Sequence, residues 1–475
     1  MSPFSFYLFG VTGNLAQIKV IPALYDLFEK KLIPKGSHII GVARKEMTPD
    51  QFRSFVWDIL QTPNRHHTHP IRDEVWQEMC EHLSYQSGDF SDPKLYSTIK
   101  ASLETHQIHN TIFYLATYPQ LYESIFTNLK TAGLTNQDKG FTRLMLEKPI
   151  GIDLASAKRL NAQVSQYFEE SQVYRLDHYL GKETLQNILT FRFGNGLLEH
   201  LFNHEFVDHI QITASEDYGI GRRGTYFDSV GMLKDVGQNH SLQMLTTVTM
   251  DAPKEFSNEA VTRERVKVLE KLLSDPEHVV FGQYEGYTGE EFVTKDSSQD
   301  TFFALRTTID NERWQGVPIY IRAGKRLNQT CTEISLVFKN PINRLFSHLD
   351  SGNEPNILTF RIQPNEGIVF KFLSKVAGHD LKLEPQYMQF CYKYQGTDMP
   401  DAYENLISDV IKGDQTFFND AVEVEAQWSF TDPLSAIRNR PIAYEQGSWG
   451  PQAAFELLQQ DGREWLEPSL AMCAI

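Results

Sequence analysis

The feature that most constrains the fold is a glycine turn that directly follows the first apolar run. Residues 4–9 read F-S-F-Y-L-F and predict a short buried strand; residues 10–16 read G-V-T-G-N-L-A and precede a helical pattern that extends to about residue 30. Strand, glycine turn and helix is the context that a dinucleotide-binding fingerprint requires. The first glycine permits the tight turn, and the second lets the backbone approach a pyrophosphate at the N-terminus of the helix. The residues expected to line this cofactor site are Gly10, Thr12, Gly13, Asn14 and Leu15.

The pattern of strand followed by helix continues through the first third of the chain. Residues 38–42, 111–116 and 143–146 are apolar runs that predict further buried strands, with helical patterns between them. Such alternation predicts an α/β Rossmann-type fold, a doubly wound parallel sheet. We assign residues 1–176 to this domain.

Two basic residues follow the second predicted strand and bear on the choice of cofactor. An NAD enzyme usually has an acidic residue at this position, which binds the ribose 2′-hydroxyl. Here Arg44 and Lys45 stand instead, and two cations favour a 2′-phosphate, which predicts NADP. Glu46 leaves the use of NAD open, and a solvated loop is the alternative interpretation of the pair.

Composition excludes several classes of partner. The net charge of −16 over 475 residues argues against nucleic acid and against an anionic membrane as partners. No apolar run reaches the roughly 18 residues that a membrane span needs, and the N-terminal apolar run is too short for a signal peptide. The four cysteines are far apart and lack metal-ligand spacing, so we predict reduced thiols and a cytoplasmic protein.

A histidine-rich segment, residues 66–69, invites a metal-binding interpretation. No cysteine or carboxylate cluster accompanies it, and a catalytic zinc needs three converging ligands. We predict an exposed loop there and no metal site.

Residues 175–183 read R-L-D-H-Y-L-G-K-E and concentrate chemically active side chains. If a helix begins near Asp177, then His178 and Lys182 are four residues apart and share one face, where they form a cationic cradle suited to a phosphate dianion. Asp177 would point elsewhere and could orient a second histidine. The alternative is a solvated helix start with Asp177 as N-cap.

This nonapeptide resembles the signature R-I-D-H-Y-L-G-K-E of glucose-6-phosphate dehydrogenases, with Leu176 as the only change. Residues 147–151 resemble the E-K-P-F-G motif of the family, residues 234–243 its R-D-x-x-Q-N-H-L-L-Q helix end, and residues 324–327 its G-K-x-L motif. The resemblance extends over essentially the whole chain. It implies that residues 177–475 form a larger α+β domain that binds substrate and dimerises, giving a homodimer or a dimer of dimers. Residues 333–338, 356–363 and 367–375 alternate with period two, which independently predicts antiparallel strands there.

The resemblance also implies roles for individual residues. His240 would be the catalytic base and Asp177 the carboxylate that orients it. His178, Tyr179 and Lys182 would bind the 6-phosphate. The remaining substrate contacts would come from Lys19, Lys148, Glu216, Asp235 and Lys325, with Lys148 also touching the nicotinamide.

On this basis the expected reaction is oxidation of glucose 6-phosphate at C1 to 6-phosphoglucono-δ-lactone with hydride transfer to NADP, the first step of the oxidative pentose phosphate pathway. A same-fold dehydrogenase for another hexose phosphate or sugar is one alternative. It is suggested by Gly237, unusual inside a predicted helix, and by Thr330, where many relatives carry a cation. A non-catalytic dinucleotide sensor is the other alternative, although a sensor has no need of Asp177 and His240. We predict no second, structural NADP.

Overall fold

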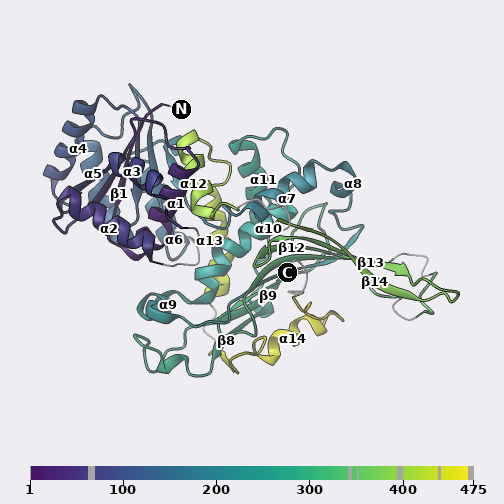
Figure 1. Cartoon of the computed structure of the whole chain (residues 1–475). Coiled ribbons are helices and arrows are strands. Elements are labelled where there is room, and N and C mark those ends of the chain that lie inside the picture. The colour runs from purple at the N-terminus through teal and green to yellow at the C-terminus, as the bar shows by residue number, and fades with distance from the viewer. Residues whose placement is uncertain are drawn as a thin grey trace. The chain divides into compact units, whose positions relative to one another are not determined.

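The computed structural model describes residues 2–62, 70–340, 345–349, 352–392, 399–436 and 440–468. The chain divides into two compact units (Figure 1). The first unit comprises Met1–Gly181, Ser257–Thr262 and Pro400–Glu425, and the second comprises Lys182–Phe256, Arg263–Met399 and Ala426–Ile475. The histidine-rich segment at 66–69 lies outside the described residues.

The first unit is built on a six-stranded, wholly parallel sheet with the strand order β3-β2-β1-β4-β5-β6. This order reverses direction next to β1, which is the topology of a doubly wound Rossmann sheet, so the predicted fold class is confirmed. Two strands were not predicted, because β3 is polar and half-buried and β6 has only three residues. The strands are β1 (Ser5–Phe9), β2 (His38–Ala43), β3 (Leu83–Ser87), β4 (Thr111–Leu115), β5 (Thr142–Leu146) and β6 (Val173–Arg175).

Helices follow the strands of this sheet and bury an apolar side against it. The helix after β1 starts with a π-helical turn, η1 (Ala16–Val20), and continues as α1 (Ile21–Glu29). A late segment, α12 (Ala402–Lys412), packs into the same core through Leu406, Ile407 and Val410. The remaining helices wholly within the unit are α2 (Pro49–Gln61), α3 (Asp73–His82), α4 (Pro93–His106), η2 (Pro119–Leu121), α5 (Tyr122–Thr131), α6 (Leu154–Val164) and η3 (Glu170–Gln172).

The second unit contains a nine-stranded mixed sheet of order β14-β13-β12-β11-β7-β10-β9-β8-β15. Most neighbours are antiparallel, as predicted from the period-two segments, while β7–β10 and β8–β15 are parallel pairs. The central strands β7 and β10 are buried on both faces, although β7 reads V-D-H-I-Q-I-T-A-S and alternates apolar with polar residues. The strands are β7 (Val207–Ser215), β8 (Val279–Tyr284), β9 (Phe302–Thr307), β10 (Ile319–Gly324), β11 (Cys331–Phe338), β12 (Ile357–Gln363), β13 (Gly367–Lys375), β14 (Leu383–Cys391) and β15 (Ile442–Tyr444).

The helix predicted around Gly237 has three parts. The first, α9 (Gly224–Met232), is interrupted by non-helical backbone at Gly231. A π-helix, η5 (Leu233–Ser241), follows and continues as α10 (Leu242–Thr249). The other helices that include residues of this unit are α7 (Glu183–Phe193), α8 (Gly196–Glu199), η4 (Gly221–Arg223), α11 (Asn258–Glu270), η6 (Pro276–His278), η7 (Tyr287–Gly289), α13 (Ala421–Ser435) and α14 (Gln452–Gln459).

No helix starts at Asp177 in the structure, contrary to the prediction. Residues 178–181 form a turn, and α7 starts only at Glu183. The Leu180 N–H donates to the Asp177 carbonyl at 3.0 Å, and the Gly181 carbonyl accepts a bond from the Asn405 side chain at 3.0 Å. The premise that His178 and Lys182 share one helical face is therefore wrong.

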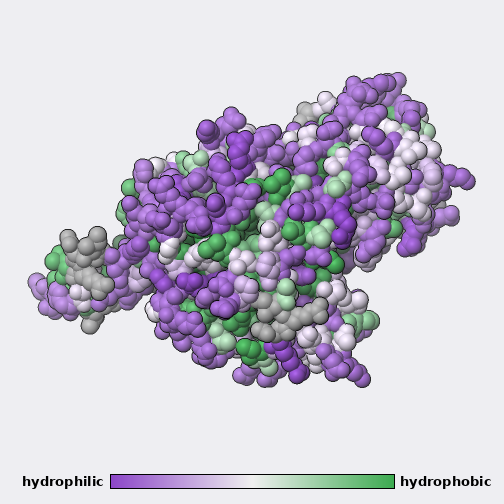
Figure 2. All heavy atoms as spheres, turned by 180° about the vertical axis from the view of Figure 1, so that it is seen from behind, coloured by the Kyte–Doolittle hydropathy of each residue, from purple (hydrophilic) through white to green (hydrophobic). Residues whose placement is uncertain are grey.

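The surface is largely polar, and Figure 2 shows hydrophilic residues over most of the face drawn there. Within the described residues no helix is both long and apolar enough to cross a membrane. Cys80 and Cys331 are free, as predicted, but Cys391 takes part in a disulfide bond, so the prediction of reduced thiols is wrong for that residue.

Candidate functional site

The glycine turn after β1 has the shape that a dinucleotide site needs. Gly10 adopts φ +84°, and its N–H donates to the Val42 carbonyl at 2.9 Å, which ties the turn to β2. A Cβ at Gly10 would lie 2.4 Å from the Ala116 carbonyl oxygen, so a larger residue cannot stand there. The Gly13 N–H donates to the Gly10 carbonyl at 2.8 Å, and Gln17 braces the turn by donating to the Thr12 carbonyl at 2.7 Å. The turn therefore fits a pyrophosphate at the start of the following helix.

Arg44 lies exposed directly after β2. The neighbouring backbone is held from β3, because the Tyr85 hydroxyl donates to the carbonyls of Ala43 and Lys45. Arg44 also acts on Asp89, whose pKa is lowered chiefly by hydrogen bonds from Ser91 and secondarily by this guanidinium. An exposed guanidinium beside the turn is suited to a phosphate on the ribose.

The segment after β6 presents Asp177, His178 and Tyr179 from a turn. Asp177 is buried, and its Oδ1 accepts the Tyr179 N–H at 2.9 Å, an arrangement in which the aspartate closes its own turn. The His178 ring contacts Tyr179 edge-on at 5.0 Å and stacks against Tyr403 at 6.3 Å between centroids. The carboxylate and both rings are thus held in fixed positions within the first unit.

A buried carboxylate network lies at the end of β5. Glu147 accepts a hydrogen bond from the Tyr114 hydroxyl and one from Tyr403. Burial raises the pKa of Glu147 to about 7, against the hydrogen bonds from the two tyrosines and the charge of Lys148, which lower it. The Lys148–Pro149 peptide is cis. The network was missed in the sequence because Tyr403 lies more than 250 positions from Glu147.

Lys19 comes from the π-helical turn η1. Its ammonium pairs with Asp401 at 3.2 Å and lies 5.5 Å from the centre of the Tyr403 ring. In the first unit, Tyr403 thus contacts three of the elements that carry predicted site residues.

In the second unit, Glu216 and Lys325 follow the carboxyl ends of two neighbouring parallel strands. Strands β7 and β10 pair in register with Ser215 opposite Gly324, so the next residue of each strand reaches the same edge. The Lys325 ammonium forms an ion pair with the Glu216 carboxylate, and the rings of Tyr218 and Phe227 lie 5.6 and 5.2 Å from it. Carboxyl ends of parallel strands are where open α/β sheets bind ligands. A fixed ammonium and carboxylate there can bond to adjacent sugar hydroxyls.

Asp235 and His240 both belong to the π-helix η5 and are both buried. They are five residues apart, and a π-helix bonds residues i and i+5, so its wider turn brings the two positions nearer to one face than an α-helix would. Tyr226 donates to Asp235 at 3.5 Å, and Arg223 lies 3.9 Å from its other oxygen. The Asn239 side chain accepts the N–H of His240 at 2.7 Å. Single-turn π segments occur frequently at functional sites.

Lys182 and Thr330 differ in charge and in their hydrogen-bond partners. The Lys182 ammonium donates to the Gln363 side chain at 2.7 Å, which adds an amide beside the predicted phosphate-binding lysine. No sequence signal pointed to Gln363, since it ends an ordinary strand. Thr330 donates to the Asp217 carboxylate at 2.5 Å, so a neutral, already bonded hydroxyl stands at this position.

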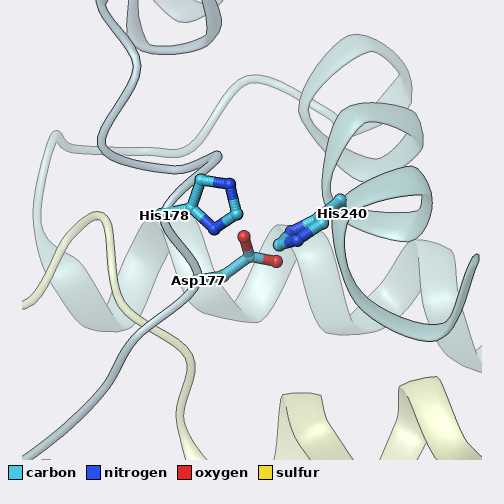
Figure 3. A group of neighbouring side chains, drawn as sticks. All are labelled: Asp177, His178 and His240. Carbon is cyan, nitrogen blue, oxygen red and sulfur yellow. The ribbon is translucent and has the colours of Figure 1, made fainter. Parts of the chain in front are cut away.

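The predicted site residues divide between the two units. The first unit holds Gly10, Thr12, Gly13, Asn14, Leu15, Lys19, Arg44, Lys148, Asp177, His178 and Tyr179, and the second holds Lys182, Glu216, Asp235, His240 and Lys325. Figure 3 draws Asp177 and His178 on the turn after β6 and His240 on the helix η5. Arg223, Tyr226, Gln363 and Tyr403 are additional residues that contact members of this set.

Comparison with known proteins gives full-length matches. Residues 7–187 match the family model "Glucose-6-phosphate dehydrogenase, NAD binding domain", and residues 189–466 match "Glucose-6-phosphate dehydrogenase, C-terminal domain". A glucose-6-phosphate 1-dehydrogenase of Chlamydia muridarum is 39% identical, with 96% of each chain covered. Glucose-6-phosphate 1-dehydrogenase 2 of Mycobacterium tuberculosis is 38% identical, with 98% of this chain and 95% of the relative covered.

Two solved structures are similar over nearly their whole length. A glucose-6-phosphate 1-dehydrogenase from Mycobacterium avium superposes with a TM-score of 0.87 at 34% identity, covering 99% of this chain and 100% of that one. A glucose-6-phosphate dehydrogenase in complex with its substrate glucose 6-phosphate gives a TM-score of 0.89 at 33% identity, covering 98% and 99%.

Proposed function

The chain belongs to the glucose-6-phosphate dehydrogenase family, and from that premise we propose that it oxidises glucose 6-phosphate at C1 to 6-phosphoglucono-δ-lactone, with His240 as base and Asp177 as its partner. The observation that carries the assignment is the match of both family models, which together cover residues 7–187 and 189–466. Oxidation of an alcohol carbon needs a base for the hydroxyl proton, a positioned hydride acceptor and a grip on the rest of the substrate. The chain offers a residue for each requirement.

A ring nitrogen of His240 takes the proton from the C1 hydroxyl as the O–H bond breaks and the C1 carbonyl forms. NADP, when bound, accepts the hydride that leaves C1. The carboxylate of Asp177 holds the imidazole in the productive tautomer and stabilises the imidazolium that results. Both side chains are almost completely buried, and a dry environment strengthens this interaction between charges.

His178, Tyr179 and Lys182 bind the 6-phosphate, and Gln363, which bonds to Lys182, fixes the lysine in place. A phosphate so far from the reacting carbon contributes binding energy that orients C1. The ring hydroxyls are bound by Lys19, Lys148, Glu216, Asp235 and Lys325. The Lys325–Glu216 pair supports this role, because the two groups are preorganised at one sheet edge before any sugar arrives.

The turn at Gly10 to Leu15 would hold the cofactor pyrophosphate, and Lys148 would contact the nicotinamide. The cofactor is NADP, with Arg44 as the ligand of the 2′-phosphate. Its exposure and its place directly after β2 support this role. We assign cofactor binding to residues 1–176 and substrate binding and dimerisation to residues 177–475.

Replacing Arg44 by alanine tests the cofactor assignment. Loss of a hydrogen bond to a charged group costs about 1.5–3 kcal/mol, so KM for NADP should rise about 10- to 100-fold while KM for NAD stays within about twofold. Steady-state kinetics with both cofactors measure this, and Arg159→Ala, which removes an exposed arginine of α6, is the matched control. Equal rises for NADP and NAD would remove Arg44 as the 2′-phosphate ligand.

The protein acts in the cytoplasm as a homodimer or a dimer of dimers. Support for assembly through the large sheet comes from β14, where Tyr387, Met388 and Phe390 expose 47%, 57% and 36% of their surfaces. Sedimentation velocity of the purified chain measures the mass, and Met388→Asp should shift it toward the monomer. A monomer at micromolar concentration for the unchanged chain would contradict the proposal.

A steady-state assay with glucose 6-phosphate and NADP tests the reaction itself, with glucose and glucosamine 6-phosphate as competing substrates. The highest kcat/KM is expected for glucose 6-phosphate, and a preference for another sugar would point to the consequences of Thr330. Asp177, His178 and His240 are also residue types that can hold a metal ion. We expect turnover to survive dialysis against EDTA, since a base and an oriented imidazole need no metal.

A further inference from the structure

The helix that carries His240 begins at a break. At Gly231 the backbone takes φ 76° and ψ 173°, so the N–H groups of Met232 and Leu233 start a new helical segment without partners from the preceding turn. Orphan N–H groups at a buried helix start require other acceptors. The positions of these acceptors therefore decide where the helical segment lies and how it is rotated.

Asp300 supplies both acceptors. Its carbonyl accepts the Met232 N–H at 3.0 Å, and its carboxylate Oδ2 accepts the Leu233 N–H at 2.8 Å. The other carboxylate oxygen accepts from the Gln299 side chain at 2.8 Å. A Cβ at Gly231 would lie 1.9 Å from Gln299 Nε2 and 2.2 Å from Asp300 Oδ1, so the approach is as close as glycine allows.

Phe303, three residues after Asp300, makes a second close contact with the helix at Gly237. A Cβ at Gly237 would come within 2.9 Å of the Phe303 ring. Gly237, unexplained in the sequence, therefore marks the close approach of a buried ring. Phe303 belongs to β9, which is hydrogen-bonded inside the large sheet between β8 and β10. Two contacts six positions apart fix both the depth and the rotation of the turn that includes Asp235 and His240.

Capping by Asp300 is chemically costly. The residue is partly buried, and this burial raises its pKa to about 6 against the hydrogen bonds from Leu233, Gln299 and Met232. The carboxylate is therefore ionised at neutral pH, and its negative charge faces the positive end of a helix. Asparagine would offer Leu233 the same acceptor without the charge.

We propose that Asp300 is a positioning residue for the dehydrogenase reaction, which holds the η5 turn, and with it His240, at the depth and rotation that proton abstraction requires. This inference rests on the proposed role of His240 as the base. Asp300 does not touch the reacting atoms, and it acts through Leu233 and the π-helix.

The test compares Asp300→Ala, Asp300→Asn and the control Asp275→Ala in the full-length protein. Asp275 also caps a helical turn in the second unit, accepting the Glu277 N–H at 3.0 Å, but that turn carries no site residue. Asp300→Ala should lower kcat about 10- to 100-fold with KM for NADP within about twofold, since a small misplacement of a catalytic group costs about that much. Asp300→Asn should recover kcat to within about threefold of the unchanged enzyme, and Asp275→Ala should leave it unchanged.

Unchanged kcat in Asp300→Ala, or Asp300→Asn as impaired as Asp300→Ala, overturns the proposal. Should Asp300→Ala fail to fold, Phe303→Leu tests the second contact with the cap intact, and it should lower kcat several-fold with no change in the dissociation constant of NADP. Unchanged kcat there also overturns the proposal. The assignment of His240 as the base is tested separately. If that assignment is wrong, turnover should persist in His240→Asn, whatever the result for the Asp300 variants.

Discussion

Replacing His240 by asparagine should lower kcat by about 10²- to 10⁴-fold, the usual contribution of a positioned general base. The amide keeps the approximate size of the imidazole but cannot accept the C1 hydroxyl proton. The dissociation constant for NADP should stay within about twofold, because the glycine turn and Arg44 belong to the other unit. Steady-state turnover and fluorescence titration with NADPH measure the two quantities.

His178→Asn is the matched control for that variant, since it removes an imidazole assigned to the phosphate instead of to proton transfer. It should raise KM for glucose 6-phosphate more than it lowers kcat. Turnover in His240→Asn equal to that of the unchanged enzyme would exclude this histidine as the base. Equal losses of kcat in both variants would mean that the two imidazoles do not have separate roles.

Local sequence patterns were sufficient for four of the six strands in the sheet of the first unit. A buried parallel strand is a continuous apolar run, so β1, β2, β4 and β5 were predictable from short windows, and the glycine turn could be placed between β1 and its helix. Strand β3 reads L-S-Y-Q-S and is largely half-buried, so no such run marks it. Its Tyr85, which holds the loop of Arg44, was missed for the same reason.

The prediction of a helix start at Asp177 was wrong because a side-chain hydrogen bond of Asp177 forms a turn there instead. The i, i+4 argument assumed regular backbone, but the Asp177 carboxylate bonds the N–H two residues on and forms a turn. Aspartate is favoured both at helix starts and in such turns, so the residue type does not decide between them. Gln363 beside Lys182 and Tyr403 beside Glu147 come from elements about 180 and 250 positions away, where only the tertiary fold brings them together.

The π-helix could not be predicted either. Residues 226–250 have a helical pattern, and nothing local distinguishes an α- from a π-turn. The break at Gly231 and the tight packing at Gly237 are explained only by Asp300 and Phe303. These two residues lie just before and within β9, more than sixty positions later in the chain. Motifs were sufficient to propose the candidate site residues, whereas Asp300 and Phe303, which contact the helix of His240, have no local sequence signature.

Replacing Asp177 by asparagine should lower kcat by about 10²- to 10⁴-fold, comparable to the loss in His240→Asn, because an amide can bond either imidazole tautomer and cannot stabilise the imidazolium. Asparagine still accepts the Tyr179 N–H, so the turn after β6 should survive. Kinetics of the purified variant at pH 8, with circular dichroism to confirm its fold, measure the effect.

The double variant Asp177→Asn/His240→Asn then distinguishes a working pair from two independent residues. If the carboxylate acts only through the imidazole, removing both should cost about as much as removing His240 alone, within about threefold. Independent contributions would instead multiply, because uncoupled sites add in free energy. A multiplied loss would contradict the proposed pairing of Asp177 with His240 while leaving each residue important, and it would assign the carboxylate to the sugar instead of to the base.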